Sequence, residues 1–215
     1  MNLNNGIGAI LIPVIIYMAG CSTQQMIQQN SALPVTQQDN VPPEKAHDSF
    51  EPAQHDYDRA LEYLDSGRNN NAKQLLLALT EAYPEFSGPY ANLGILYMRE
   101  GSMETAEEYL TKAVEINPAN AMAYNQLGIL YRQTGRFDAA RQAYIQSLQI
   151  KPDYANAHLN LGILCDLFLQ DTKGALQHYE RYLELVPGEN SQVSLWLADL
   201  KQRIANNNIS TNEIQ

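Results

Sequence analysis

The sequence is poor in the residues on which chemistry and nucleic-acid binding depend. Its 14 lysines and arginines face 24 aspartates and glutamates, which gives a net charge of −10, so it lacks the basic stripe that binds nucleic acid. None of its four histidines lies in an HExxH motif, its two cysteines form no CxxC motif, and no phosphate-binding glycine loop is present. We therefore expect no enzyme activity, no metal, no cofactor and no small-molecule substrate.

Long apolar runs are also missing. The longest, Ile7–Ala19, is interrupted by Pro13 and is shorter than the roughly 20 residues that span a membrane. A short apolar run ahead of small residues is typical of a secretory signal, although no lysine or arginine precedes this one. The residues Met18-Ala19-Gly20-Cys21 resemble the bacterial lipobox, with Met18 where leucine is usual. This resemblance implies a signal peptide over residues 1–20 and lipidation of Cys21. A cleaved, secreted form and an uncleaved anchor are the alternatives.

The residue after Cys21 bears on location. In lipoproteins of enteric-type bacteria an aspartate there retains the protein in the inner membrane, and this chain has Ser22. The resemblance therefore implies a Gram-negative outer membrane, with a palmitate-bearing anchor facing the periplasm. Residues 21–52 are rich in glutamine and proline and poor in aromatic residues, which predicts a disordered linker. As a flexible chain it would span about 30 Å.

The rest of the chain is dominated by a repeat. The tetrapeptide Leu-Gly-Ile-Leu occurs three times, with its glycines evenly spaced at Gly94, Gly128 and Gly162. Small residues, turn glycines and prolines recur at the same period. Apolar residues between them follow helical spacing, a glycine breaks each first helix, and a proline ends each second helix. The spacing predicts two helices in every unit.

These positions resemble the tetratricopeptide repeat (TPR) family, whose unit has the same period of about 34 residues. The resemblance implies an all-α, right-handed superhelical solenoid over residues 53–188, with units at 53–86, 87–120, 121–154 and 155–188. Unit 4 carries an extra residue within Leu167–Thr172. A capping helix is expected over residues 189–205, with Leu195 and Trp196 among its apolar residues, and a disordered tail over 206–215. Cys165 and His158 occupy positions where other units have tyrosine, so both are interpreted as packing residues.

In this family the first helix of each unit lines a concave groove that binds partner proteins. Positions are counted from the first residue of each unit. Chaperone-binding members hold carboxylates with lysine or arginine at repeat positions 2, 5 and 6. Those positions carry neither residue here, so we do not expect this chain to bind that class of ligand. What remains is an isoleucine row beside an amide row. The amides of Asn92, Gln126 and Asn160 are candidates to bind a partner's main chain, unless these residues merely pack between helices. The predicted groove residues are Tyr57, Leu61, Asn92, Ile95, Met98, Asn125, Gln126, Ile129, Arg132, Asn160 and Ile163.

The resemblance implies a membrane-anchored periplasmic scaffold that binds proteins of the cell envelope. Similar lipoproteins are the pilotin-like proteins of type IV pilus assembly, repeat proteins of TonB-associated transport, and adaptors for peptidoglycan hydrolases. A self-associating structural lipoprotein is the alternative from a different class, because exposed solenoid ends can stack. No spacing in the sequence identifies the partner.

Overall fold

The computed structural model describes residues 51–188 and 191–212, all of them helix or short connection. The expected signal peptide, Cys21 and nearly all of the predicted linker lie outside the described residues. Among the described helices, none combines the length and the apolar character needed to cross a membrane.

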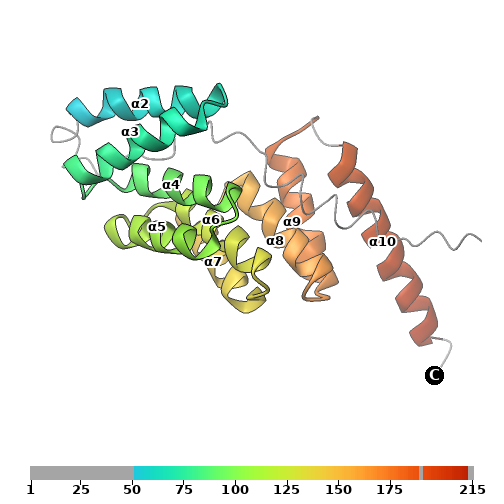
Figure 1. Cartoon of the computed structure of the whole chain (residues 1–215). Coiled ribbons are helices and arrows are strands. Elements are labelled where there is room, and N and C mark those ends of the chain that lie inside the picture. The colour runs from blue at the N-terminus through green and yellow to red at the C-terminus, as the bar shows by residue number, and fades with distance from the viewer. Residues whose placement is uncertain (1–50, 189–190, 213–215) are drawn as a thin grey trace, which may run out of the picture. The chain divides into compact units, whose positions relative to one another are not determined.

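Eight of the helices form consecutive antiparallel pairs (Figure 1). We call the first helix of each pair the A helix and the second the B helix. The pairs are α2 (Glu51–Asp65) with α3 (Asn69–Ala82), α4 (Ser87–Arg99) with α5 (Met103–Ile116), α6 (Ala121–Gln133) with α7 (Phe137–Ile150), and α8 (Ala155–Leu167) with α9 (Thr172–Leu185). The predicted all-α repeat fold is confirmed.

The glycines of the repeated tetrapeptide lie where the two helices of a unit cross. A Cβ atom built on Gly94 would lie 2.5 Å from Leu110 Cγ, and one built on Gly128 would lie 2.4 Å from the Tyr144 ring. Gly162 faces Tyr179 in the same way, at 2.7 Å. Any side chain at these positions would push the helices apart, which explains why a residue that weakens helices recurs in the middle of one.

The turns between A and B helices depend on a left-handed residue. Gly67, Gly101 and Gly135 have φ values of 72°, 82° and 76°, a conformation that glycine adopts without steric conflict. In unit 4 the extra residue places Gln170 there, with φ of 54°. The predicted distortion of this turn is therefore confirmed. Asp171 then caps α9, because its side chain accepts a hydrogen bond from the Gly174 N–H at 2.9 Å.

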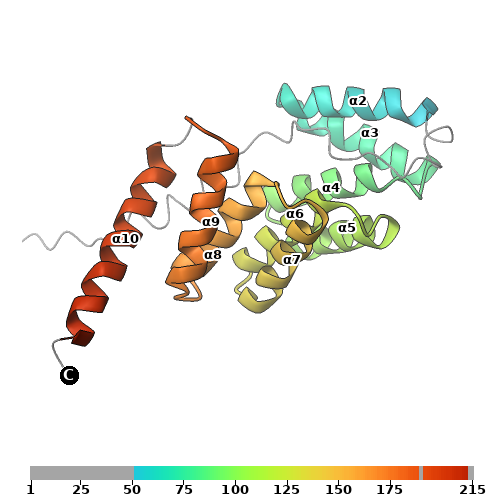
Figure 2. The same cartoon turned by 180° about the vertical axis from the view of Figure 1, so that it is seen from behind.

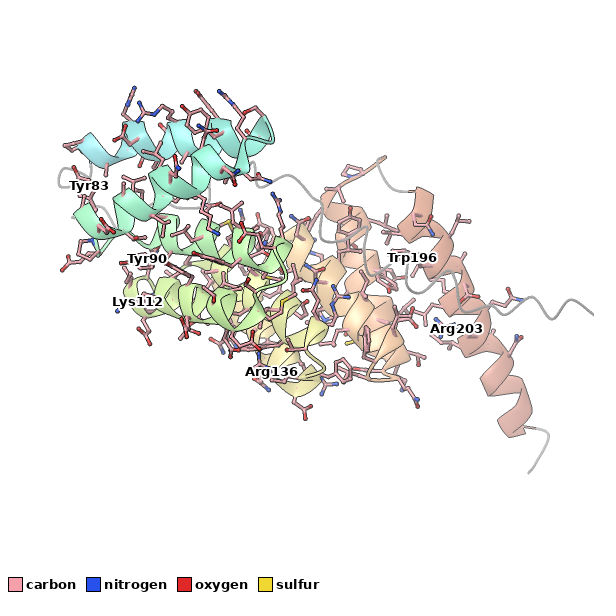
Figure 3. The ribbon with its side chains drawn as sticks, in the orientation of Figure 1. Tyr83, Tyr90, Lys112, Arg136, Trp196 and Arg203 are labelled. Atoms are coloured by element: carbon pink, nitrogen blue, oxygen red, sulfur yellow. The ribbon has the colours of Figure 1, made fainter. Side chains whose placement is uncertain are left out.

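The C-terminal helix, α10 (Ser191–Asn212), packs beside α9 in both views (Figures 1 and 2). It continues past the expected end at Ala205, because no glycine or proline follows to stop it. Val193 and Leu200 are buried against unit 4, and Trp196 is half-buried there with its ring 6.0 Å from that of Tyr179 (Figure 3). Leu195, predicted among the apolar residues of this helix, points elsewhere and is 65% exposed.

Candidate partner-binding face

The residues predicted for the groove come from the four A helices, at repeat positions 5, 6, 9 and 12. We call this set the A-helix face. The A helices α4, α6 and α8 contact one another in succession, and α2 joins them through a hydrogen bond from the Asn92 amide to the Tyr57 hydroxyl at 2.7 Å. The structure therefore places the predicted residues in one continuous row.

A second hydrogen bond repeats the first, two units further along. Asn160 Nδ2 donates to Asn125 Oδ1 at 3.0 Å, again between position 6 of one unit and position 5 of the unit before. The amides of Asn92 and Asn160 thus bridge neighbouring A helices. They hold the register of the repeats, a role that the spacing in the sequence could not reveal. Asn92 Oδ1 is buried and has no hydrogen-bond partner among the described residues, so it keeps one acceptor for a ligand.

Most side chains of the predicted row are buried in this structure. Ile95, Ile129 and Ile163 are 7%, 6% and 2% exposed, and each packs within the helical layer. Leu61, Met98 and Gln126 are half-buried, which makes them the members of the row that solvent reaches best. The assignment of this face to partner binding stays a prediction, and these three residues are its accessible part.

Charge at position 12 of the A helices is confined to units 3 and 4. Position 12 is Leu64 in unit 1 and Met98 in unit 2, but Arg132 in unit 3 and Asp166 in unit 4. The Asp166 carboxylate is held by Arg203 of α10, at 2.6 Å between Oδ1 and Nη2 (Figure 3). The Tyr179 hydroxyl donates to its other oxygen at 3.4 Å, and burial together with that carboxylate strongly raises the pKa of the Tyr179 phenol.

The structure also brings together two histidines that the sequence keeps apart. His158 of α8 and His178 of α9 lie 3.0 Å apart between their Nδ1 atoms, and His158 Nε2 lies 3.0 Å from the Pro152 carbonyl oxygen. The carbonyl can only accept, so His158 Nε2 carries a proton and its Nδ1 accepts from Nδ1–H of His178. Burial, and after it the neighbouring His158 imidazole, lowers the pKa of His178 to about 4.

Among the described residues, neither this pair nor Cys165 forms part of a metal-binding cluster. Among the described residues no three metal-binding side chains gather at one place, so the two histidines lack a third protein ligand. Cys165 is buried and unbridged, and burial, reinforced by Asp171, raises the pKa of its thiol to about 11. Such a thiol remains protonated at neutral pH, which agrees with the predicted packing role.

Comparison with known proteins supports the repeat. A sequence model of the tetratricopeptide repeat matches residues 87–153 and 120–187. A search of curated proteins finds no match. A solved structure of PilF from Pseudomonas aeruginosa is 24% identical with a TM-score of 0.64, over 71% of this chain and 69% of that one.

Two other solved structures contain a similar repeat fold. The first TPR domain of Spaghetti (RPAP3), bound to the HSP90 peptide SRMEEVD, is 24% identical with a TM-score of 0.52, over 55% of this chain and 93% of that one. The O-GlcNAc transferase of Thermobaculum terrenum is 21% identical with a TM-score of 0.57, over 61% of this chain and 25% of that one. At these identities the likeness is one of fold. With its helix pairs, its crossing glycines and a repeat model that matches residues 87–187, the chain has a TPR repeat fold.

Proposed function

We propose that the chain is a lipid-anchored periplasmic scaffold that binds a segment of an envelope protein along its A-helix face. The observation that carries this proposal is the continuous row of side chains on that face, fixed in register by the Tyr57–Asn92 and Asn125–Asn160 hydrogen bonds. A pre-aligned row lowers the entropic cost of binding an extended or helical segment. The envelope system is type IV pilus assembly or TonB-associated transport.

Substitutions at the accessible part of the face test this proposal. Aspartate at Ile129 or Ile163 would place a charge in the buried layer and unfold the domain, so these residues are poor probes. Met98→Glu and Gln126→Glu add charge at half-buried positions instead. We expect both to reduce capture of envelope proteins in a crosslinking pull-down while the helical circular dichroism is retained. Ile145→Glu, at a half-buried position on α7, is the matched control. Equal capture by all variants would refute the assignment of the binding face.

The anchor is tested separately. Cys21→Ala should abolish incorporation of a labelled fatty acid and move the protein from the outer-membrane fraction to the soluble periplasmic fraction, because several acyl carbons at about 0.8 kcal/mol per buried CH₂ hold it there. Cys165→Ala leaves Cys21 in place and should stay labelled. Persistent labelling of Cys21→Ala would rule out lipidation at this residue.

A further inference from the structure

Arg132 is a buried cation to which the described part of the chain supplies no counter-ion. Its side chain is 3% exposed, and its three guanidinium nitrogens are buried without a hydrogen-bond partner among the described residues. The guanidinium keeps its positive charge at any physiological pH. A buried charge is strongly unfavourable unless an opposite charge and hydrogen bonds compensate it. Within residues 51–188 and 191–212, no ion pair with Arg132 compensates this charge.

The Tyr144 hydroxyl lies close to Arg132. It is also buried and has no close hydrogen-bond partner among the described residues, but Arg132 lies near enough for its guanidinium to act on the phenol both by charge and as a hydrogen-bond donor. Tyr144 comes from α7 and passes over Gly128, and Arg132 lies one helical turn after that glycine on α6. Together the two side chains offer a guanidinium fork and one hydroxyl donor, a set suited to a single carboxylate.

Unit 4 has a charged residue and a tyrosine at the corresponding positions, and there both side chains have partners. Asp166 is the counterpart of Arg132 and Tyr179 is the counterpart of Tyr144. There the charge at position 12 has an opposite charge, Arg203, supplied by a helix that follows the repeats. The phenol also finds its partner, since the Tyr179 hydroxyl donates to Asp166. Unit 3 has the charge and the phenol but nothing among the described residues that supplies the opposite charge. The missing component is an acidic group.

We propose that Arg132, assisted by the Tyr144 hydroxyl, binds one glutamate or aspartate side chain of the partner segment that the A-helix face holds. The inference rests on the proposed function and adds the chemistry of the partner. A chain of net charge −10 repels acidic segments in general, so recognition depends on this one cation. Because the nitrogens are covered in the free chain, the Arg132 side chain must turn outward or its neighbours must separate, and this reduces the apparent affinity.

Thermal stability tests the premise that the charge of Arg132 is uncompensated. Arg132→Met keeps most of the apolar stem and removes the charge. If no group compensates the guanidinium, we expect the Tm of the full chain to rise by about 2–4 °C. Arg99→Met, at an exposed position of α4, is the matched control and should leave the Tm unchanged. A lower Tm for Arg132→Met would show that a buried water or another group already satisfies the guanidinium, and would overturn the proposal.

The ligand is tested with two peptide pools. Both contain capped nonapeptides with randomised apolar residues, one with glutamate and the other with glutamine at the centre. We expect the full chain to enrich the glutamate pool at least about tenfold, as for one charge-assisted contact. This preference should vanish in Arg132→Met and weaken in Tyr144→Phe. Equal retention of the two pools, or a preference that survives Arg132→Met, would overturn the proposal.

The same pools separate this inference from the function on which it rests. Met98→Glu should reduce retention of both pools if the A-helix face binds peptides. If it does so while Arg132→Met changes nothing, the face stands and the carboxylate site fails. If Met98→Glu leaves retention unchanged, the proposed binding face itself fails. Retention of neither pool by the wild-type chain counts against both.

Discussion

At the scale of single residues, the close crossing of the two helices in a unit depends on a glycine, because glycine has no Cβ atom. Replacing Gly128 with alanine would favour α6 by about 1 kcal/mol through helix propensity. The new Cβ, however, would lie 2.4 Å from the rigid, fully buried ring of Tyr144, and overpacking of this kind costs about 1–3 kcal/mol. Because the Tyr144 ring cannot yield, a cost in the upper part of this range, less the gain in propensity, leaves about 1–2 kcal/mol. We expect Gly128→Ala to lower the free energy of unfolding by this amount, measured by urea denaturation.

The control for this substitution is Gln142→Ala, at an exposed position of α7, which should stay within about 0.5 kcal/mol of the wild type. A Gly128→Ala variant as stable as the wild type would show that α6 and α7 separate at no cost. The glycine would then need another explanation.

A second effect at the scale of single residues is the pH dependence of stability that the histidine pair causes. The pKa of His178 is lowered to about 4 in the folded chain and lies near 6.5 in the unfolded chain. Between these values the unfolded chain binds the additional proton, so stability present above pH 6.5 is lost as the pH falls towards 4. We expect the unfolding free energy to drop by about 1–2 kcal/mol between pH 7 and 5, an amount reduced by partial solvent exposure.

Equilibrium unfolding at several pH values measures this effect. His178→Gln should flatten the profile in that window, whereas His55→Gln, at an exposed position of α2, should retain it. An unchanged slope in His178→Gln would remove His178 as its cause.

At the scale of elements, the periodic spacing of small and apolar residues was sufficient to predict the helix pairs. Gly94, Gly128 and Gly162 mark the crossings because the repeat period is a local property of the chain. The pairing of Asn125 with Asn160 depends instead on how one unit docks against the next. The same is true of Arg203, which comes from a helix whose direction relative to unit 4 no spacing determines. Leu195 fits the apolar spacing of α10 but does not lie on the face with which α10 packs against unit 4.

The attachment of α10 gives a prediction at this scale. Arg203 neutralises Asp166, whose side chain is 7% exposed, whereas Arg203 itself is 43% exposed. Removing the partner of a buried charge costs about 3–5 kcal/mol, and an exposed pair is worth about 0–1 kcal/mol. For this intermediate case we expect Arg203→Met to lower the unfolding free energy by about 1–3 kcal/mol in denaturant titrations.

Arg181→Met removes a comparable but exposed pair with Glu184 and should change stability by less than about 1 kcal/mol. In a double-mutant cycle, Asp166→Asn should suppress most of the effect of Arg203→Met, since the carboxylate is then already neutral. Additive effects of the two substitutions would show that the pair contributes no coupling energy.

At the scale of the whole molecule, stability in a repeat array is the sum of unit stabilities and contacts between neighbours. Units 2 and 3 have neighbours on both sides. Salt bridges join consecutive units there, with Lys73 Nζ 2.7 Å from Glu100 Oε2 and Arg136 Nη2 2.6 Å from Glu107 Oε2. The first of these cations also lies over the Tyr97 ring, 3.9 Å from its centre. Helix α10 packs chiefly on α9, so the array should open from its C-terminal end.

Hydrogen exchange followed by mass spectrometry tests this order. We expect peptides from α10 to exchange first, and those from α6 and α7 last, because opening of a terminal element breaks one interface and opening of a central one breaks two. Arg203→Met should accelerate exchange in α10 and unit 4 while leaving α4 and α5 unchanged, since only adjacent units share contacts. Equal acceleration in every helix would instead mean that the array unfolds in one cooperative step, and the release of α10 alone would then be too rare to observe.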